Sequence, residues 1–319
     1  MSVILISGAT GFIGSALYER LKHNHHVHKL VRYVAGRFNF YADDLTHFAD
    51  LRDSDSVRRV VLSVKPDIVI HLAAQSAVAY SFENPEEVAK VNTLGTLAVA
   101  EALLETRRGH MIHASSSEVY GHARHFPTPE DEPTSAISPY AVSKIAAEHY
   151  LRVLHETKGL HVTIMRPFNT FGRALVKNRH FVVERAITQA LTSGKITLHD
   201  PSPLRDFMFR EDHVDAYVRA VAIISGGLAE NLDGQTINIT TGQCYSIREM
   251  ANEVARLVEQ RRGTPVSVEF SEVPDRPLDI ERLYGDNSKA KELLGWWPQY
   301  SLEAGLEKAI EEWAQALNT

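Results

Sequence analysis

Short apolar runs alternate with longer amphipathic segments through the first half of the chain. An apolar run of roughly four to eight residues suits a buried strand, whereas apolar positions spaced three and four apart mark one face of a helix. The predicted strands are Val3–Ile6, Val27–Val31, Ile68–Leu72, Met111–Ala114 and Val162–Met165. The predicted helices are Phe12–Lys22, Ser54–Val64, Asn92–Glu105 and Pro139–Glu156. This alternation predicts an α/β fold built on a doubly wound parallel sheet.

From about Asn169 the pattern becomes less regular, with Arg, Pro and Gly in the loops. The predicted helices here are Phe181–Thr192, Arg210–Ile224 and Ile247–Gln260, and the predicted strands are Thr197–His199, Thr236–Ile239 and Val266–Phe270. We therefore expect a first domain over residues 1–168 and a smaller α/β domain over residues 169–319. Some later segments, such as 205–240, are expected to return to the first domain.

Composition and charge narrow the class of protein. The 319 residues include 34 Lys and Arg against 40 Asp and Glu, a formal net charge of −6, which argues against a nucleic-acid or membrane-surface partner. The single cysteine, Cys244, excludes an internal disulfide and a multi-cysteine zinc site. The N-terminal segment lacks the features of a signal peptide, and no stretch approaches the roughly 20 apolar residues of a membrane span. We therefore expect a cytoplasmic protein.

A glycine-rich loop joins the first predicted strand to the first predicted helix. Its sequence from Ser7 is Ser-Gly-Ala-Thr-Gly-Phe-Ile-Gly. Gly8 permits a tight turn, Gly11 lets the backbone approach a pyrophosphate, and Gly14 allows the helix to pack closely on the strand. The unpaired N–H groups of the helix N-terminus then face the phosphates. A loop of this kind between a strand and a helix predicts a dinucleotide cofactor.

The end of the second predicted strand bears on the choice between NAD and NADP. An acidic residue there binds the ribose 2′-hydroxyl of NAD, but this chain has Arg32, which suits the 2′-phosphate of NADP. Arg37 is a second candidate for that phosphate. The alternative is a surface arginine in an NAD-binding protein. The sequence favours NADP.

Two side chains four residues apart on a predicted helix are candidates for proton transfer. Tyr140 and Lys144 share one helix face, with Ser138 as the expected N-cap and Pro139 at the first helical position. A lysine ammonium beside a phenol is expected to lower the tyrosine pKa toward working pH. A serine hydroxyl from the end of the neighbouring strand, which is followed by Ser115, can orient a substrate hydroxyl.

Together these motifs resemble the extended short-chain dehydrogenase/reductase family along nearly the whole chain. The family contains nucleotide-sugar epimerases, 4,6-dehydratases, decarboxylases and 4-keto reductases. The resemblance implies a Rossmann-type dinucleotide-binding domain followed by a substrate-binding domain, and a catalytic triad of Ser116, Tyr140 and Lys144. It also implies a homodimer joined by a four-helix bundle that the helices at 92–105 and 139–156 would form.

The family pattern and the motifs above give a set of expected cofactor-binding positions. Asp50 and Leu51 are expected near the adenine, and the residues that follow the third predicted strand are expected beside the cofactor. The full set is Gly8, Thr10, Gly11, Phe12, Ile13, Gly14, Arg32, Asp50, Leu51, Leu72, Ala73, Ala74, Gln75, Asn92, Ser115, Tyr140, Lys144 and Pro167.

Glu118 distinguishes the members of this family. Simple 4-epimerases usually carry a small or uncharged residue at this position, whereas in 4,6-dehydratases the glutamate removes the C5 proton. The run Ser116-Ser117-Glu118 resembles the Thr-Ser-Glu of dehydratases that act on GDP-mannose. A 4,6-dehydratase is therefore the leading hypothesis, with Ser117 assisting Glu118. An NDP-sugar 4-epimerase and an NADPH-dependent 4-keto-sugar reductase remain as alternatives.

Other positions bear on the subfamily without deciding it. UDP-glucuronate decarboxylases share the Ser-Glu pair but typically carry an arginine where this chain has Leu283, which counts against decarboxylation. The segment 276–291 resembles GDP-mannose 4,6-dehydratases and their 4-keto reductases, whereas 80–85 also resembles the glucuronate 4-epimerases.

The resemblance also names residues that would hold a nucleoside-diphosphate sugar. Asn169 and Arg205 would contact the diphosphate, Arg276 would be the second arginine, and Ser76 would lie beside the sugar. Two guanidinium groups suit a diphosphate because they form charge-assisted, bidentate bonds. The histidines between residues 23 and 28 match no common metal site, so we expect them in solvent and predict no metal.

Overall fold

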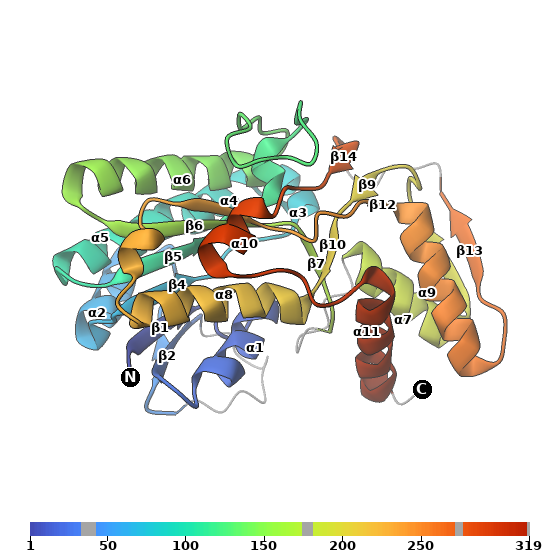
Figure 1. Cartoon of the computed structure of the whole chain (residues 1–319), viewed down its shortest axis with the longest axis horizontal. Coiled ribbons are helices and arrows are strands. Elements are labelled where there is room, and N and C mark those ends of the chain that lie inside the picture. The colour runs from blue at the N-terminus through green and yellow to red at the C-terminus, as the bar shows by residue number, and fades with distance from the viewer. Residues whose placement is uncertain (33–42, 174–180, 272–276, 318–319) are drawn as a thin grey trace.

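The apolar runs of the first half form the centre of one parallel sheet (Figure 1). A computed structural model of the chain describes residues 1–32, 43–173, 181–271 and 277–317. The seven strands of the sheet lie in the order β11-β6-β5-β4-β1-β2-β3. Their bounds are β1 Val3–Ser7, β2 His26–Val31, β3 Thr46–Phe48, β4 Ile68–His71, β5 His110–Ala114, β6 His161–Pro167 and β11 Thr236–Ile239. The predicted α/β class with a doubly wound parallel sheet is confirmed.

Helices cover both faces of this sheet, because successive strand residues point to opposite faces. On β1, Ile4 and Ile6 belong to the core beneath α1 (Phe12–Leu21) and α8 (Arg210–Ser225). Leu5 belongs to the core beneath α2 (Ser54–Val64), α5 (Gly95–Glu105) and α6 (Pro139–Lys158). The helical segments up to residue 158 are α1 Phe12–Leu21, α2 Ser54–Val64, α3 Val78–Glu83, α4 Pro85–Ala89, the π-helical turn η1 Lys90–Leu94, α5 Gly95–Glu105, the 3₁₀ turn η2 Ser117–Tyr120 and α6 Pro139–Lys158. Each of the four helices predicted in the first half is present.

The remaining elements form a second, smaller body of helices and short strands, seen at the right of Figure 1. Its core packs α7, α9 and α11 around Phe207 and Phe209. The later helices are α7 Val182–Ser193, α8 Arg210–Ser225, η3 Ala229–Asn231, α9 Ile247–Arg262, α10 Ser288–Leu294 and α11 Leu302–Leu317. The other strands are β7 Asn169–Phe171, β8 Lys195–Leu198, β9 Leu204–Arg205, β10 Phe207–Phe209, β12 Tyr245–Ser246, β13 Ser267–Phe270 and β14 Arg282–Leu283.

Two later elements lie with the first body. Helix α8 packs beside α1, and β11 pairs with β6 in the large sheet, with Ile237 opposite Met165. The chain therefore crosses between the two bodies more than once. The division at residue 168 stays a prediction.

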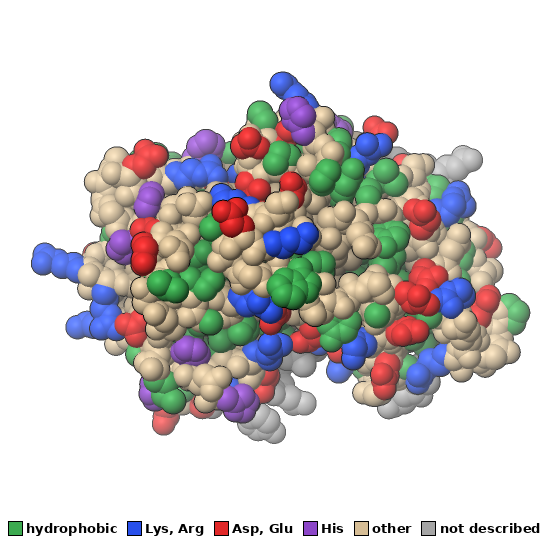
Figure 2. All heavy atoms as spheres, viewed as in Figure 1, with side chains coloured by type: hydrophobic (Ala, Val, Ile, Leu, Met, Phe, Trp, Pro, Cys, Tyr) green, Lys and Arg blue, Asp and Glu red, His purple; other side chains and the backbone are tan. Residues whose placement is uncertain are grey.

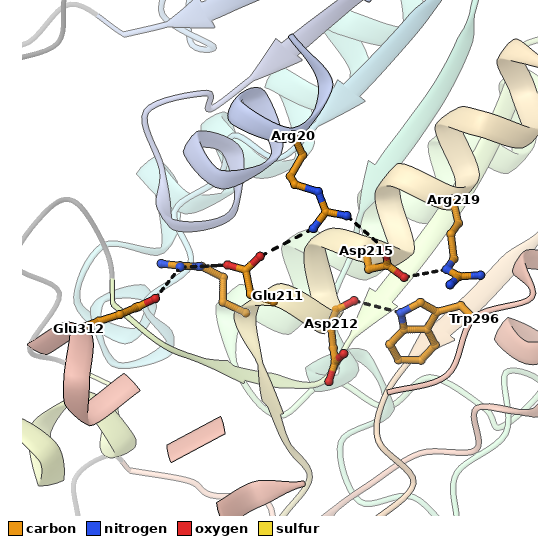
Figure 3. Close-up of polar contacts among 8 residues, drawn as sticks. Arg20, Glu211, Asp212, Asp215, Arg219, Trp296 and Glu312 are labelled. Atoms are coloured by element: carbon orange, nitrogen blue, oxygen red, sulfur yellow. Dashed lines mark hydrogen bonds and ion pairs between the residues drawn. The ribbon is translucent and has the colours of Figure 1, made fainter. Parts of the chain in front are cut away.

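Acidic residues on α8 join the two bodies (Figure 3). The Asp212 carboxylate accepts hydrogen bonds from the backbone N–H groups of Gln299 (2.8 Å) and Tyr300 (3.1 Å), which lie just before α11. The indole N–H of Trp296 donates to the Asp212 carbonyl at 3.0 Å. On the other side of α8, Arg20 of α1 pairs with Asp215 at 3.4 Å. Helix α8 thus contacts both α1 and the segment that leads into α11.

The surface and the helices agree with the charge balance of the sequence. Figure 2 shows Lys and Arg side chains interspersed with Asp and Glu on the face drawn, without a large field of one sign. Among the helices that the structure describes, none combines the length and the hydrophobicity needed to cross a bilayer.

The neighbouring residues Trp296 and Trp297 test the packing at this junction. Trp296 is fully buried, whereas Trp297 is 52% exposed beside Arg219. Trp296→Ala removes a buried ring and its hydrogen bond, so we expect a loss of about 3–5 kcal/mol in the free energy of unfolding. Trp297→Ala is the matched control, with an expected change of less than about 1 kcal/mol. Denaturant unfolding of both variants measures the difference, and equal midpoints would contradict the packing described.

Candidate active site

The glycine-rich loop takes a conformation that side chains would prevent. Gly8 has φ +74°, and a Cβ on it would lie 2.9 Å from the backbone nitrogen of Ala73. A Cβ on Gly14 would lie only 2.2 Å from the Gly8 carbonyl oxygen. The Gly11 N–H donates to that same carbonyl at 2.8 Å. Close approach of backbone to backbone therefore requires glycine at these positions.

The loop leads into α1 in a way that suits an anion. Among the described residues no side chain caps the helix at Gly11, and the first turn, which begins with Phe12 and Ile13, contains no acidic residue. The N–H groups of a helix N-terminus and the positive end of its dipole favour a phosphate there. The loop, with Thr10 in its bend, fits the pyrophosphate of a dinucleotide.

Residues after β4 lie against this loop and are tied to α6. The Ala73 N–H contacts the Ser7 hydroxyl at 3.3 Å. The amide of Asn92, in the π-helical turn, accepts from the Gln75 N–H at 2.8 Å and donates to the Gln75 carbonyl and the Ser143 hydroxyl, both at 3.0 Å. Asn92 therefore fixes the segment that includes Leu72, Ala73, Ala74 and Gln75.

The residues expected around the adenosine lie at the ends of β2 and β3. Arg32 is exposed at the end of β2, and its charge contributes to holding the pKa of Asp50 below its usual range, although the hydrogen bond from Arg52 is the larger cause. Leu51 is buried against Gly95 of α5. Arg37 lies outside the described residues. Arg32, Asp50 and Leu51 therefore lie at one edge of the sheet, just after the ends of β2 and β3.

The end of β5 carries the candidate catalytic residues into a short 3₁₀ turn. Ser116 caps this turn, because its hydroxyl accepts a hydrogen bond from the Glu118 N–H at 3.2 Å. Ser116, Ser117 and Glu118 are all buried. One turn of backbone therefore holds the triad serine and the acidic residue close together.

Tyr140 and Lys144 lie on α6 as predicted, on the face toward β5. The Lys144 ammonium donates to the Ala114 carbonyl at 2.7 Å and lies 6.0 Å from the centre of the Tyr140 ring. Burial raises the pKa of Tyr140 to about 12; Ser116 acts against this rise and Glu118 adds to it. Burial lowers the pKa of Lys144 to about 8.

The pKa of Tyr140 is therefore raised in this structure, the opposite of the net lowering expected from the sequence. The lysine ammonium is bonded to a backbone carbonyl, and the loss of water around the phenol outweighs the hydrogen bond from Ser116.

A buried ion pair lies directly behind this site. Arg166 of β6 donates two hydrogen bonds to Glu148 of α6, at 2.9 and 2.6 Å. The Ser115 hydroxyl donates to the same carboxylate at 2.5 Å, and Arg152 donates at 2.9 Å. These donors hold the pKa of Glu148 below its usual range, although burial alone would raise it. Four donors thus compensate one buried carboxylate.

The substrate-side residues lie where β6 and β9 lead toward the smaller body. Pro167 ends β6, and Asn169 begins β7, which pairs with β10. Arg205 is buried and pairs with Asp279 at 2.6 Å. Ser76 is exposed after β4. Arg276 lies outside the described residues.

The structure brings Ser116, Ser117, Glu118, Tyr140 and Lys144 to one edge of the sheet, where the carboxyl ends of parallel strands meet. Sequence reasoning gave no role to Glu148 or Arg166. The sequence signal for this pair is Arg166 itself, an arginine in an otherwise mostly apolar strand. A buried charge there needs a partner of opposite charge.

Of the four histidines near β2, His23 and His26 are exposed as expected, whereas His25 and His28 are half-buried. His28 is half-buried, and its Nδ1 lies 2.9 Å from the Nε2 of His47 on the adjacent strand. Within the described ranges, no three His, Cys, Asp or Glu side chains are grouped as metal ligands.

Comparisons with known proteins match this arrangement along the whole chain. A family model described as GDP-mannose 4,6 dehydratase matches residues 5–309. A UDP-glucose 4-epimerase from Mycolicibacterium smegmatis is 37% identical over 317 residues, which cover 96% of this chain and 97% of that protein. A dTDP-glucose 4,6-dehydratase from Xanthomonas campestris is 30% identical over 334 residues, covering 98% of this chain and 93% of that protein.

Solved structures give the same result. The UDP-glucose 4-epimerase of Thermotoga maritima with UDP-glucose has a TM-score of 0.86, with 29% identity, and covers 98% of this chain and 99% of that one. The UDP-glucose 4-epimerase of Thermus thermophilus in complex with NAD has a TM-score of 0.85 at 29% identity, with the same coverage. The resemblance drawn from the sequence is confirmed. The chain belongs to the GDP-mannose 4,6-dehydratase family, among the NAD-dependent nucleotide-sugar epimerases and dehydratases.

Proposed function

We propose that the protein is a nucleoside-diphosphate-sugar 4,6-dehydratase. Oxidation at C4 followed by loss of water from C5 and C6 requires a base beside C5. The observation that carries the proposal is the buried Glu118 carboxylate, one short turn from Ser116 and close enough to Tyr140 to raise its pKa. An epimerase inverts C4 without a base at C5.

The residues act in two stages. In the first, Tyr140 takes the proton of the C4 hydroxyl, Ser116 orients that hydroxyl, and the Lys144 ammonium favours the phenolate. A bound nicotinamide would supply reversible hydride storage and, when oxidised, positive charge that favours the phenolate. In the second stage, Glu118 removes the C5 proton, which the neighbouring ketone has made acidic, and this proton leaves with the C6 hydroxyl as water, assisted by Ser117. The stored hydride would then return to C6 and the proton taken by Tyr140 to C5, which regenerates both the cofactor and the base.

The substrate is held through its diphosphate. Arg205 is buried at the end of β9 and pairs with the Asp279 carboxylate, so a diphosphate there would share the guanidinium with Asp279. Asn169 and Ser76 complete the proposed contacts, with Arg276 as the second arginine.

We also propose a homodimer. Leu94 of the π-helical turn and Val142, Tyr150 and Val153 of α6 are large apolar side chains, each about half exposed. The three on α6 are spaced by eight and three residues and therefore share one helix face. Two copies would bury this face in a four-helix bundle formed by residues 92–105 and 139–156.

The second candidate is a 4-epimerase. It is favoured by the UDP-glucose 4-epimerase relative at 37% identity and by the epimerases among the solved structures. The two reactions share C4 oxidation and the same triad. They differ in whether Glu118 acts.

Removal of the Tyr140 hydroxyl tests the triad. Tyr140→Phe should fold and bind cofactor but lose about 10²-fold or more in turnover, because the general base is gone. Tyr300→Phe, just before α11 in the smaller body, is the control and should turn over normally. Product formation measured by mass spectrometry decides. Near-normal activity of Tyr140→Phe would remove the triad assignment.

Glu118→Gln separates the two reactions, because it keeps the size of the side chain but cannot take a proton. In a dehydratase the variant should oxidise C4 and stall, so reduced cofactor accumulates and is seen by its absorbance. The wild type should yield a product lighter by one water. Glu156→Gln, exposed on α6, is the control. A fully active Glu118→Gln enzyme that returns an isomer of unchanged mass would establish the epimerase instead.

We propose NADP rather than NAD as the cofactor, although the solved relative from Thermus thermophilus holds NAD. Arg32 is exposed at the end of β2, where an adenosine ribose would lie, and its charge suits a 2′-phosphate. Arg32→Ala should weaken NADP binding about 10-fold or more and leave NAD binding nearly unchanged. Calorimetric titration of both cofactors, with Arg59→Ala as control, measures this. Tighter binding of NAD by the wild type would refute the preference.

A further inference from the structure

His113 is a fully buried histidine directly behind the proposed catalytic lysine. It occupies the position on β5 before Ala114, whose carbonyl accepts the hydrogen bond from Lys144. Its backbone registers with His71 of β4, and the two rings stack with centroids 5.6 Å apart. Both ring nitrogens of His71 form hydrogen bonds, Nδ1 with the Ser7 hydroxyl at 2.8 Å and Nε2 with the Thr96 hydroxyl at 3.0 Å. Neither ring nitrogen of His113 has a hydrogen-bond partner among the described residues.

The groups around His113 determine its charge. Burial, together with the Lys144 ammonium and His71, holds the pKa of His113 well below its usual range. On the β6 side its registered neighbour is Ile164, which carries no charge. On α6 the further charge is Glu148, already compensated by Arg166. His113 is therefore an uncharged imidazole, with one N–H donor and one nitrogen lone pair.

Within the described residues, the Lys144 ammonium has one hydrogen-bond acceptor, the Ala114 carbonyl. Its ammonium has three N–H donors, and the bond to the Ala114 carbonyl uses one of them. Burial favours the uncharged amine and lowers the pKa of Lys144 to about 8. Each further acceptor stabilises the charged form, and buried polar atoms in proteins are commonly completed by an ordered water.

We propose that His113 is a positioning residue for Lys144, accepting a hydrogen bond from the lysine ammonium through one ordered water. Uncharged imidazole is suited to this place because it offers a lone pair to the cation without adding positive charge beside it. His113 would then keep Lys144 charged, and the charged lysine would keep Tyr140 within reach of deprotonation. The inference rests on the proposed roles of Tyr140 and Lys144.

The test is the pH dependence of C4 oxidation, followed in single turnovers by the appearance of reduced cofactor in the holoenzyme. Dehydratase and epimerase share this step. His113→Phe keeps an aromatic ring at this position but removes the nitrogen lone pair. Lys144 should therefore lose its proton at lower pH. With less positive charge nearby, Tyr140 should ionise at higher pH. The pH at which the rate is half-maximal on its acidic side should rise by about one unit, a 10-fold loss of rate below it.

Conservative variants separate this role from a structural one. His113→Asn and His113→Gln place an amide near the positions of the two ring nitrogens, and at least one should restore the wild-type pH profile. His110→Phe removes another buried imidazole from the same strand, one that is bonded to Thr163 far from the site. It should lower stability without moving the profile.

Three results would overturn the inference: an unchanged profile in His113→Phe, a uniform loss of rate at all pH values, or a shift that neither amide reverses. Tyr140→Phe serves as the reference for the proposed function itself. If that variant oxidises C4 normally, the triad assignment fails, whereas a failure confined to the His113 variants leaves the triad intact.

Discussion

The buried ion pair between Glu148 and Arg166 is the interaction on which the rest of the site depends. Both side chains are almost wholly withdrawn from water, where an unpaired charge costs several kcal/mol. Two bonds from Arg166, with further donors from Ser115 and Arg152, compensate that cost. Loss of either partner would leave the other charge buried, at a cost of about 3–5 kcal/mol.

The Glu148–Arg166 pair affects several parts of the site because of where it lies. Glu148 is one helical turn beyond Lys144, so the pair fixes α6 against the sheet at the level of the lysine. Ser115, bonded to Glu148, leads into the turn that carries Ser116 and Glu118. Arg166 lies just before the end of β6, where the chain passes to Asn169. One carboxylate thus sets the spacing between α6 and two strand ends that carry proposed catalytic and substrate contacts.

A second polar layer extends this arrangement to the edge of the sheet. The Arg166 guanidinium lies over the Tyr120 ring, 4.8 Å from its centre, and the Tyr120 hydroxyl donates to Asn238 of β11 at 2.6 Å. The Asn238 amide in turn donates to the Thr128 carbonyl at 2.9 Å. The loop after the catalytic turn is therefore bound to a strand from the second half of the sequence.

Elements with a strong apolar pattern could be predicted, and those that depend on tertiary partners could not. The strands β1, β2, β4, β5 and β6 and the glycine-rich loop follow from local sequence, because burial and close backbone approach restrict residue type. The three-residue strand β3 was not predicted, since only its pairing with β2 makes it a strand. His28 was placed in solvent because nothing local indicates that His47 lies beside it.

The site shows the same division between local and tertiary information. The spacing of Tyr140 and Lys144 correctly predicted a shared helix face, but the direction of the Tyr140 pKa shift was wrong. Spacing says nothing of burial, and here burial is the larger cause. No role was predicted for Glu148, because a glutamate four residues after a lysine is typical of any exposed helix. Its role is visible only when β6 places Arg166 against it.

The electrostatics of the site suit a reaction that begins with an oxidised cofactor. Burial raises the pKa of Tyr140 to about 12 and lowers the pKa of Lys144 to about 8. A bound cationic nicotinamide would favour the phenolate, and reduction of the ring would remove that charge. On the proposed mechanism Tyr140 would therefore accept a proton when the ring is oxidised and return it when hydride leaves. On that mechanism, the burial that raises the pKa of Tyr140 would make its ionisation depend on the charge of the cofactor.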